Sequence, residues 1–268
     1  FKQYLSPAVI EELIQHPQSL KLGGERRELS IFFSDLRGFT GISEKLDPES
    51  LTSLLNEYLS AMTDIIQEED GTVDKYSGDA IIAFWNAPLD QPDHAERAVR
   101  TALRCQEKLA ELRPNFRARI GEDLVMRIGL HTGPVVVGNM GSRTRFNYTI
   151  LGDAANLASR LEGLNKEFGT SLMVSEATRR LTGNAFGFRE ISYVQVVGRR
   201  EPVRVFEPMF MQEFKVREKE LAAFARGLEL YYNGAFQKAL EIFENIGKRD
   251  PTADAYARDC RMLIENPP

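Results

Sequence analysis

Two aspartates stand beside short β-prone runs, where a carboxylate can be held at the edge of a sheet. Asp35 lies at the end of the mostly apolar run LSIFFSDL, and Asp79 follows Gly78 between two β-prone runs in KYSGDAIIAFW. Gly beside Asp is typical of a tight turn because both tolerate positive φ, so this stretch predicts a β-hairpin. Asp79 either caps this turn or, together with Asp35, provides the oxygen ligands of a metal site.

The order of the surrounding elements favours the metal site. Hydrophobic periodicity predicts strand, helix, strand, strand, helix and strand at residues 29–36, 48–69, 72–76, 80–85, 94–112 and 124–132. A helical crossover leaves the first two strands parallel, so the hairpin turn lies at the end where the first strand finishes. If the third strand pairs with the first, Asp35 and Asp79 face each other. Adjacent carboxylates repel unless cations lie between them, and hard oxygen ligands select Mg²⁺ or Mn²⁺, which predicts a two-metal site.

A second group of polar residues follows downstream. Another strand is predicted at 134–138, and a polar loop with Arg143 leads to the run YTIL, which contains Thr149. In the helix after this run, Asn156 and Arg160 are four residues apart and therefore share a face. They form either an ordinary exposed pair or a pair that acts on a ligand. A strand, a short helix and a hairpin complete this part, at residues 172–174, 175–181 and 186–208.

Composition indicates a soluble globular protein with one large domain and an appendage. The chain has 268 residues, of which 43% are hydrophobic and 27% are charged. No run approaches the roughly 18 apolar residues of a membrane span, and no signal-peptide pattern is present. The net charge of −5 argues against a general nucleic-acid binder. Cys105 and Cys260 lack metal-ligand spacing, so free buried thiols in the reducing cytoplasm are expected.

Three parts are expected along the chain. Residues 1–24 predict a transmitting helix, opened by Ser6-Pro7, and a linker at Gly23-Gly24. Residues 25–211 form the catalytic body, an antiparallel sheet with helices on one face. Residues 212–268 are helical, with small and aromatic residues at the offsets of a single tetratricopeptide repeat, in which Pro251 ends the second helix. Such a unit rarely stands alone, so it packs on the body, on a dimer mate or on a partner.

Three motifs carry a family resemblance. FFSDLRGFT, KYSGDAIIAFW and YTILGDAANLASRLE, in this order, resemble the class III adenylyl and guanylyl cyclases over about Glu25 to Met209. The resemblance implies an α+β fold, with a ferredoxin-like βαββαβ core and a smaller αβ extension. It also implies that Asp35 and Asp79 bind two Mg²⁺ or Mn²⁺ ions. The chain begins without Met, and FKQYLSP with the repeat-like tail resembles cyclases fused behind a membrane-bound sensor, so we expect a cytoplasmic piece of a longer membrane-anchored protein.

The resemblance assigns the remaining roles. Lys75 and Thr149 read the purine, while Asn156 and Arg160 orient the ribose and stabilise the transition state. In the family the site forms at a head-to-tail dimer interface, where one protomer gives the two aspartates and the other gives these four residues. Arg143 and, in the late hairpin, Arg199 are candidates for the terminal phosphates. Around Arg199 the sequence departs from the pattern, because many relatives carry lysines at 197 and 199.

Donor and acceptor counting favours ATP as the substrate. Lys75 can donate to adenine N1 and Thr149 can accept from the 6-amino group, whereas guanine N1 carries a proton that Lys75 would face. Guanylyl cyclases typically have Glu at the lysine position. The predicted function is therefore an adenylyl cyclase; the alternatives are a guanylyl cyclase and a silent cyclase-like binding module.

The site also suggests a regulator. The lysine-threonine pair resembles the subgroup that contains bicarbonate-responsive cyclases. Because Thr149 is uncharged, the pocket is expected to keep the positive charge of Lys75, which favours binding of a small anion such as bicarbonate. Alternatively, Thr149 is simply another acceptor for the adenine amino group. His131, in a strand pattern, is expected to be packed rather than catalytic.

Overall fold

The strand β1 lies inside an eight-stranded sheet, between β3 and β4. The computed structural model describes residues 7–16, 23–142, 144–195 and 201–266. The strand order is β2-β3-β1-β4-β6-β8-β7, with β5 paired to β4. The strands are β1 (Gly23–Leu36), β2 (Thr72–Ser77), β3 (Ala80–Trp85), β4 (Met126–Gly141), β5 (Phe146–Leu151), β6 (Leu172–Ser175), β7 (Phe186–Val194) and β8 (Val203–Phe210). Among these described strands, β4 and β6 pair in parallel and the other pairs are antiparallel.

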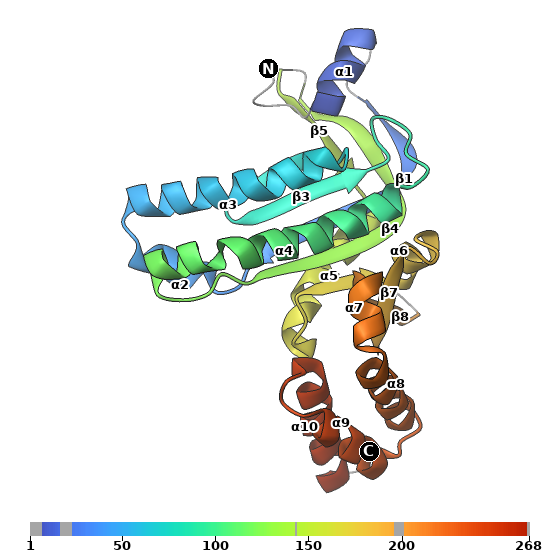
Figure 1. Cartoon of the computed structure of the whole chain (residues 1–268). Coiled ribbons are helices and arrows are strands. Elements are labelled where there is room, and N and C mark those ends of the chain that lie inside the picture. The colour runs from blue at the N-terminus through green and yellow to red at the C-terminus, as the bar shows by residue number, and fades with distance from the viewer. Residues whose placement is uncertain (1–6, 17–22, 143, 196–200, 267–268) are drawn as a thin grey trace.

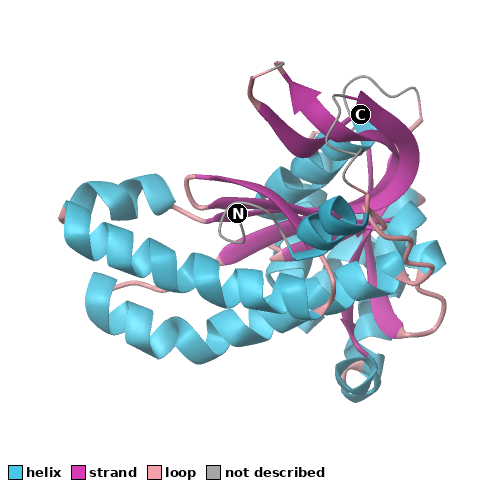
Figure 2. Ribbon diagram, turned by 90° about the horizontal axis from the view of Figure 1, so that it is seen from above, coloured by secondary structure: helices cyan, strands magenta, loops and turns pink. Residues whose placement is uncertain are grey.

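Helices cover both faces of the sheet at β1. Successive strand residues point to opposite faces, and both Ile31 and Phe32 are fully buried. Phe32 packs with residues of α3 (Pro48–Glu68) and α4 (His94–Ile120), which lie side by side (Figures 1 and 2). Ile31 packs with α5 (Asp153–Phe168) instead. The expectation of helices on one face was therefore wrong, and the burial of both faces explains why this strand is apolar along its second half.

The predicted hairpin and its neighbour are confirmed. β2 and β3 are joined by Gly78 and Asp79, and Gly78 has a φ of 62°. β3 pairs with the second half of β1, from Ser30 opposite Trp85 to Ser34 opposite Ile81. This register places the hairpin turn beside the end of β1.

Two predicted strand boundaries were wrong, because β1 and β4 are both longer than expected and pair along the whole of β1. β4 is one strand of 16 residues that runs through Pro134, where two strands were expected. Its long partner is β1, which begins at Gly23. A Cβ added to Gly138 would lie 2.3 Å from Gly23 O, so these strands approach closely because glycine faces glycine. Gly23-Gly24 thus belong to the sheet, although sequence reasoning placed a linker there.

The remaining helices are short or terminal. The sequence did not predict a separate helix at α2 (Phe39–Lys45), and α4 continues past residue 112 to Ile120 with Pro114 inside it. The others are α1 (Pro7–Gln15), α6 (Glu176–Leu181), α7 (Met211–Val216), α8 (Glu218–Tyr232), α9 (Phe236–Ile246) and α10 (Pro251–Glu265). No helix in the described ranges is both long and apolar enough to cross a membrane.

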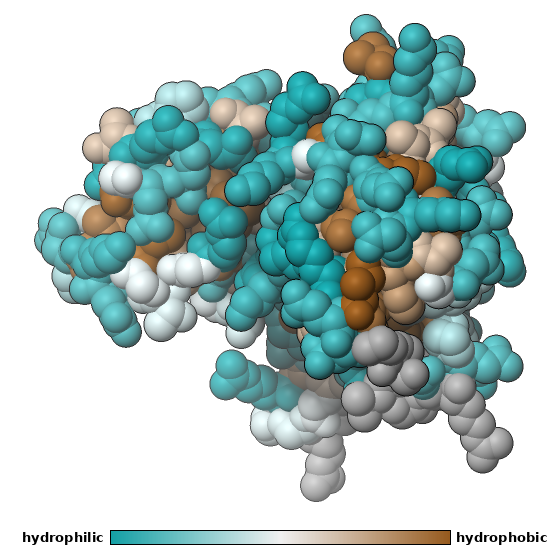
Figure 3. Space-filling view, turned by 90° about the horizontal axis from the view of Figure 1, so that it is seen from below, coloured by the Kyte–Doolittle hydropathy of each residue, from teal (hydrophilic) through white to brown (hydrophobic). Residues whose placement is uncertain are grey.

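Seen from below, the side on which the C-terminal helices α8, α9 and α10 lie, the surface is mostly hydrophilic, with limited hydrophobic areas (Figure 3).

The helices α8, α9 and α10 form an appendage with a core of its own. Gly227 of α8 lets α9 approach, because a Cβ there would lie 2.9 Å from the ring of Phe243. Asp250 caps α10 and accepts from the backbone N–H of Thr252 at 3.0 Å. Pro251 therefore begins the third helix, whereas the sequence analysis had it end the second.

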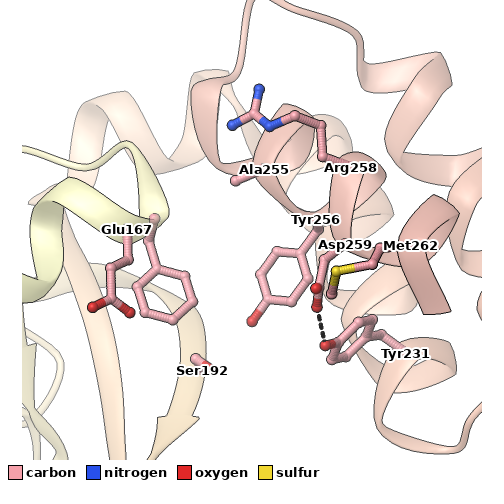
Figure 4. Close-up of a pocket in the computed structure, with 9 residues that line it drawn as sticks. Glu167, Ser192, Tyr231, Ala255, Tyr256, Arg258, Asp259 and Met262 are labelled. Carbon is pink, nitrogen blue, oxygen red and sulfur yellow. Dashed lines mark hydrogen bonds between the residues drawn. The ribbon is translucent and has the colours of Figure 1, made fainter. Parts of the chain in front are cut away.

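The appendage packs on the body of the same chain. Arg189 of β7 forms an ion pair with Asp250, and its Nη2 lies 2.6 Å from Glu207 Oε2. Tyr256 of α10 donates a hydrogen bond to Ile191 O at 2.7 Å. A cavity of about 460 Å³ lies at this junction. Figure 4 shows Tyr256 reaching into it, beside the hydrogen bond from Tyr231 to Asp259.

We expect the Arg189 to Asp250 pair to stabilise this junction. Both side chains are buried, at 5% and 4% exposure. The substitution Arg189→Met leaves Asp250 as a buried charge without this partner, which lowers the free energy of unfolding by about 3 kcal/mol. The control is Arg258→Met, which removes an exposed helical pair with Asp254 and costs about 0.5 kcal/mol or less. Urea titration measures both losses, and equal losses would contradict the assigned role.

A buried polar network joins α4 to the sheet. Ser30 Oγ lies 2.8 Å from both His94 Nδ1 and Thr132 Oγ1, and Thr132 Oγ1 lies 2.9 Å from Thr178 Oγ1. Burial lowers the pKa of His94, although the carboxylates of Glu28 and Asp93 oppose this. The folded protein therefore holds His94 neutral where the unfolded chain protonates it.

This network makes stability depend on pH. Below the unfolded pKa of about 6.5 the unfolded chain binds more protons than the folded one, so the free energy of unfolding falls as the pH falls. Substitution His94→Gln removes the titrating group and should flatten the decrease between about pH 7 and pH 5. Urea titrations across this range compare the two chains. A variant that loses stability as steeply as the wild type would exclude His94 as a source.

Candidate functional site

The end of β1 and the hairpin turn bring Asp35 and Asp79 to one edge of the sheet. Asp79 Oδ2 accepts a hydrogen bond of 2.6 Å from the backbone N–H of Leu36, the residue after Asp35. Burial raises the pKa of the Asp79 carboxyl, and the nearby charge of Asp35 adds to the rise. The juxtaposition that the topology predicted is therefore present, and it carries the electrostatic cost that was expected of it.

Arg127 of β4 occupies the space beside Asp35. The two residues are cross-strand partners, and the guanidinium makes two contacts of 3.1 Å with the carboxylate. Glu162 of α5 lies 3.4 Å from the same guanidinium. Burial raises the pKa of Glu162 to about 8, and the hydrogen bond with Asp35 and the negative charge of Asp35 add to the rise. Sequence reasoning missed Arg127 and Glu162, since only the long-range strand register places Arg127 opposite Asp35.

The carboxylates of Asp35 and Asp79 fit Mg²⁺ or Mn²⁺ when a bound ligand and water supply the remaining oxygen atoms. Among the residues that the structure describes, no group of three or more His, Cys, Asp or Glu side chains is placed to hold a metal ion. Asp35 and Asp79 offer two carboxylates, and Mg²⁺ commonly uses one or two carboxylates together with substrate phosphates and water. Burial is the main cause of the raised pKa of Asp79, and the repulsion from Asp35 that adds to it is what a bound cation would relieve.

Lys75 of β2 and Thr149 of β5, far apart in the sequence, are in contact with each other. Lys75 Nζ lies 3.4 Å from Thr149 Oγ1, which joins β2 to β5. Asp74 lies beneath them: Thr149 Oγ1 donates to Asp74 Oδ2 at 2.9 Å, and Lys75 Nζ lies 3.6 Å from the same oxygen. Asp74 is a residue to which sequence reasoning gave no role, although two adjacent charges within a strand pattern were a signal.

Asn156 and Arg160 share the outer face of α5. Both are exposed, whereas Leu157, Ala158 and Leu161 are buried against the sheet. The shared face that the spacing predicted is therefore confirmed. Arg143 and Arg199, the candidates for phosphate binding, lie outside the described residues.

His131 and the cysteines are structural. His131 is 5% exposed, and its Nδ1 lies 2.7 Å from Ser175 Oγ, so it is packed as expected. Cys105 and Cys260 are free and buried, and burial raises the pKa of Cys105 to about 12. Neither thiol is a nucleophile near neutral pH.

Comparison with known proteins supports the family resemblance that the three sequence motifs carry. The chain matches the family described as "Adenylate and Guanylate cyclase catalytic domain" over residues 24–208. It is 37% identical over 182 residues to "Adenylate cyclase 1" of Rhizobium meliloti, an alignment that covers 68% of this chain and 27% of that protein. It is 34% identical over 188 residues to "Adenylate cyclase" of Anabaena cylindrica, covering 68% and 36%. The chain thus spans about a quarter to a third of the length of these relatives.

Solved structures of both nucleotide specificities resemble the chain. The adenylyl cyclase CyaB from P. aeruginosa has a TM-score of 0.66 and 36% identity, and covers 70% of this chain and 96% of its own. The guanylyl cyclase Cya2 has a TM-score of 0.64 and 37% identity, and covers 70% and 94%. Overall similarity to these structures therefore does not distinguish adenine from guanine nucleotides as the substrate.

Proposed function

Because the chain belongs to the adenylate and guanylate cyclase catalytic domain family, we propose that it is an adenylyl cyclase that converts ATP to 3′,5′-cyclic AMP and pyrophosphate. The observation that carries the choice of ATP is the 3.4 Å contact between Lys75 and Thr149. The contact places an ammonium donor beside a hydroxyl oxygen, which is the pattern that adenine N1 and its 6-amino group require. A guanine base would present a proton to Lys75, so the pocket penalises GTP.

We further propose that Asp35 and Asp79 hold two Mg²⁺ or Mn²⁺ ions. Ions held by these two carboxylates would supply the positive charge that acidifies the ribose 3′-hydroxyl and neutralises the leaving pyrophosphate. Arg127 pairs with Asp35 in this structure and so balances its charge. The Asp79 carboxylate accepts a hydrogen bond from the backbone N–H of Leu36, which keeps the two carboxylates at the same edge.

Arg160 and Asn156 complete the proposed mechanism from a second protomer. A guanidinium offers fork-shaped donors to a phosphorus centre on which charge develops, and Asn156 offers an amide to the ribose. The outer face of α5 makes both side chains available to a partner. The cross-strand pair Val136 and Leu151 is 40% and 66% exposed, and such apolar exposure supports a homodimer of this chain.

The positive charge of Lys75, which was expected to favour bicarbonate, has a carboxylate beside it. Asp74, whose side chain is 3% exposed, lies 3.6 Å from Lys75 Nζ and offsets its charge. The charge argument for a bicarbonate site is therefore weaker than the sequence suggested. We also propose that the domain is the cytoplasmic part of a membrane-anchored protein. The chain spans about a quarter to a third of these relatives, which supports only the proposal that the protein is longer.

A mixing experiment tests whether the site is shared between protomers. Asp79→Ala removes a metal ligand and Arg160→Ala removes the phosphate donors, so each variant alone should lose about 100-fold or more in turnover. A heterodimer of the two contains one site with both wild-type halves, so the mixture should regain up to about a quarter of wild-type activity when half of the dimers are mixed. Cyclic AMP production is measured after mixing, with heterodimers verified by two different affinity tags.

The control for this experiment is a mixture of Asp79→Ala with Asp35→Ala. Both substitutions lie on the metal half, so no heterodimer of these two chains contains an intact site. Recovery in this control, or its absence in verified Asp79→Ala and Arg160→Ala heterodimers, would exclude the shared site.

A further inference from the structure

An irregularity in β2 directs two adjacent side chains toward the same hydroxyl group. Val73 pairs with Ala83 and Lys75 pairs with Ile82, so Asp74 is an extra residue in the ladder between β2 and β3. On a regular strand, neighbours point to opposite faces. A β-bulge re-aims a side chain, and here both Asp74 and Lys75 reach Thr149.

Counting protons at Thr149 shows what these contacts do. A threonine hydroxyl has one proton to donate and two lone pairs that accept. Thr149 gives its proton to Asp74 Oδ2 at 2.9 Å, and Lys75 Nζ donates to Thr149 Oγ1 at 3.4 Å. An ionised carboxylate can only accept, so the proton of Thr149 is committed to Asp74. One lone pair of Thr149 is left, and only a donor on the ligand can use it.

We propose that Asp74 is a positioning residue that fixes Thr149 as an acceptor, so that the pocket selects purine nucleotides with a 6-amino group over those with a 6-oxo group. This inference rests on the proposed function and adds the residue that sets its base specificity. Without Asp74, the hydroxyl of Thr149 is free to rotate and can donate to a carbonyl oxygen equally well. Lys75 and Thr149 alone therefore do not determine the polarity of the pocket.

The surroundings of Asp74 support a fixed orientation of the Thr149 hydroxyl group. Its side chain is 3% exposed, so the carboxylate has little access to water as a substitute partner. The pKa of the Asp74 carboxyl is raised because burial outweighs the hydrogen bond from Thr149 and the charge of Lys75, which both lower it. The same two contacts that orient the hydroxyl thus also favour the ionised, acceptor-only form of Asp74.

Substitution of Asp74 by an apolar residue of similar size tests the proposal. Asp74→Leu removes the acceptor, so the ratio of kcat/KM for ATP to that for GTP should fall at least about tenfold, the effect of one mispaired hydrogen bond. Asp74→Asn keeps a carbonyl oxygen and should retain most of the selectivity. The matched control is Asp64→Leu on the exposed surface of α3, which should leave the ratio unchanged.

A third substrate separates positioning from mere support of the fold. Purine riboside triphosphate has no group at position 6, so Asp74→Leu should alter its kcat/KM much less than that for ATP. If the substitution lowers kcat/KM for ATP, GTP and purine riboside triphosphate by the same factor, Asp74 acts only structurally and the proposal is wrong.

Binding of substrates that cannot cyclise keeps this test independent of turnover. The Kd values of 3′-deoxy-ATP and 3′-deoxy-GTP, measured with Mn²⁺, report the base pocket alone. Their ratio should shift toward GTP in Asp74→Leu by a similar factor, and an unchanged ratio would overturn the proposal. A wild-type chain that prefers 3′-deoxy-ATP but forms no cyclic product would contradict the proposed function and leave the role of Asp74 to be decided by this ratio.

Discussion

Pairing of β1 on both edges is the constraint from which the site geometry follows. β4 is in register with β1 from Gly23 to Leu36, and β3 is in register with its second half. The first pairing puts Arg127 opposite Asp35, and the second puts the turn with Asp79 beside the end of β1. A slip of one residue would exchange Ile31 and Phe32 between two separately packed core clusters, so the packing on both faces opposes a change of register.

Two charged residues of the candidate site, Asp35 and Lys75, have an opposite charge nearby within the chain. Arg127 contacts Asp35, and Lys75 lies close to Asp74. An unpaired charge would be costly at the buried Asp74 and at the partly buried Asp35 and Arg127, so pairing lets the fold hold these charges before any ligand arrives. Binding of metal and nucleotide would then exchange partners rather than create new charge in the site.

The sequence was sufficient for features that depend on local chemistry and element order. Gly78-Asp79 predicted the hairpin because few residues tolerate such a turn, and the helical crossover predicted that Asp79 would meet Asp35. The spacing of Asn156 and Arg160 predicted their common face in the same way. These inferences needed only periodicity, turn preference and the rule that crossovers leave strands parallel.

Features that depend on long-range register were beyond sequence reasoning. β4 continues through Pro134 only because β1 extends to Gly23 beside it. Arg127 faces Asp35, and Glu162 approaches both, through contacts between elements that no local pattern reports. Asp74 escaped notice because its place in the site depends on a bulge. The adjacent charges of Asp74 and Lys75 are visible in the sequence, but they do not show that a bulge turns both side chains toward Thr149.

The central claim is that Lys75 and Thr149, with the Thr149 hydroxyl held as an acceptor by Asp74, make this a cyclase for adenine nucleotides. The most direct measurement is a competition: the purified chain is incubated with equal concentrations of ATP and GTP and with Mn²⁺, and both cyclic products are quantified by mass spectrometry in the same reaction. The account predicts that cyclic AMP exceeds cyclic GMP at least about tenfold, as one mispaired hydrogen bond requires. Equal amounts of the two products, or an excess of cyclic GMP, would contradict it.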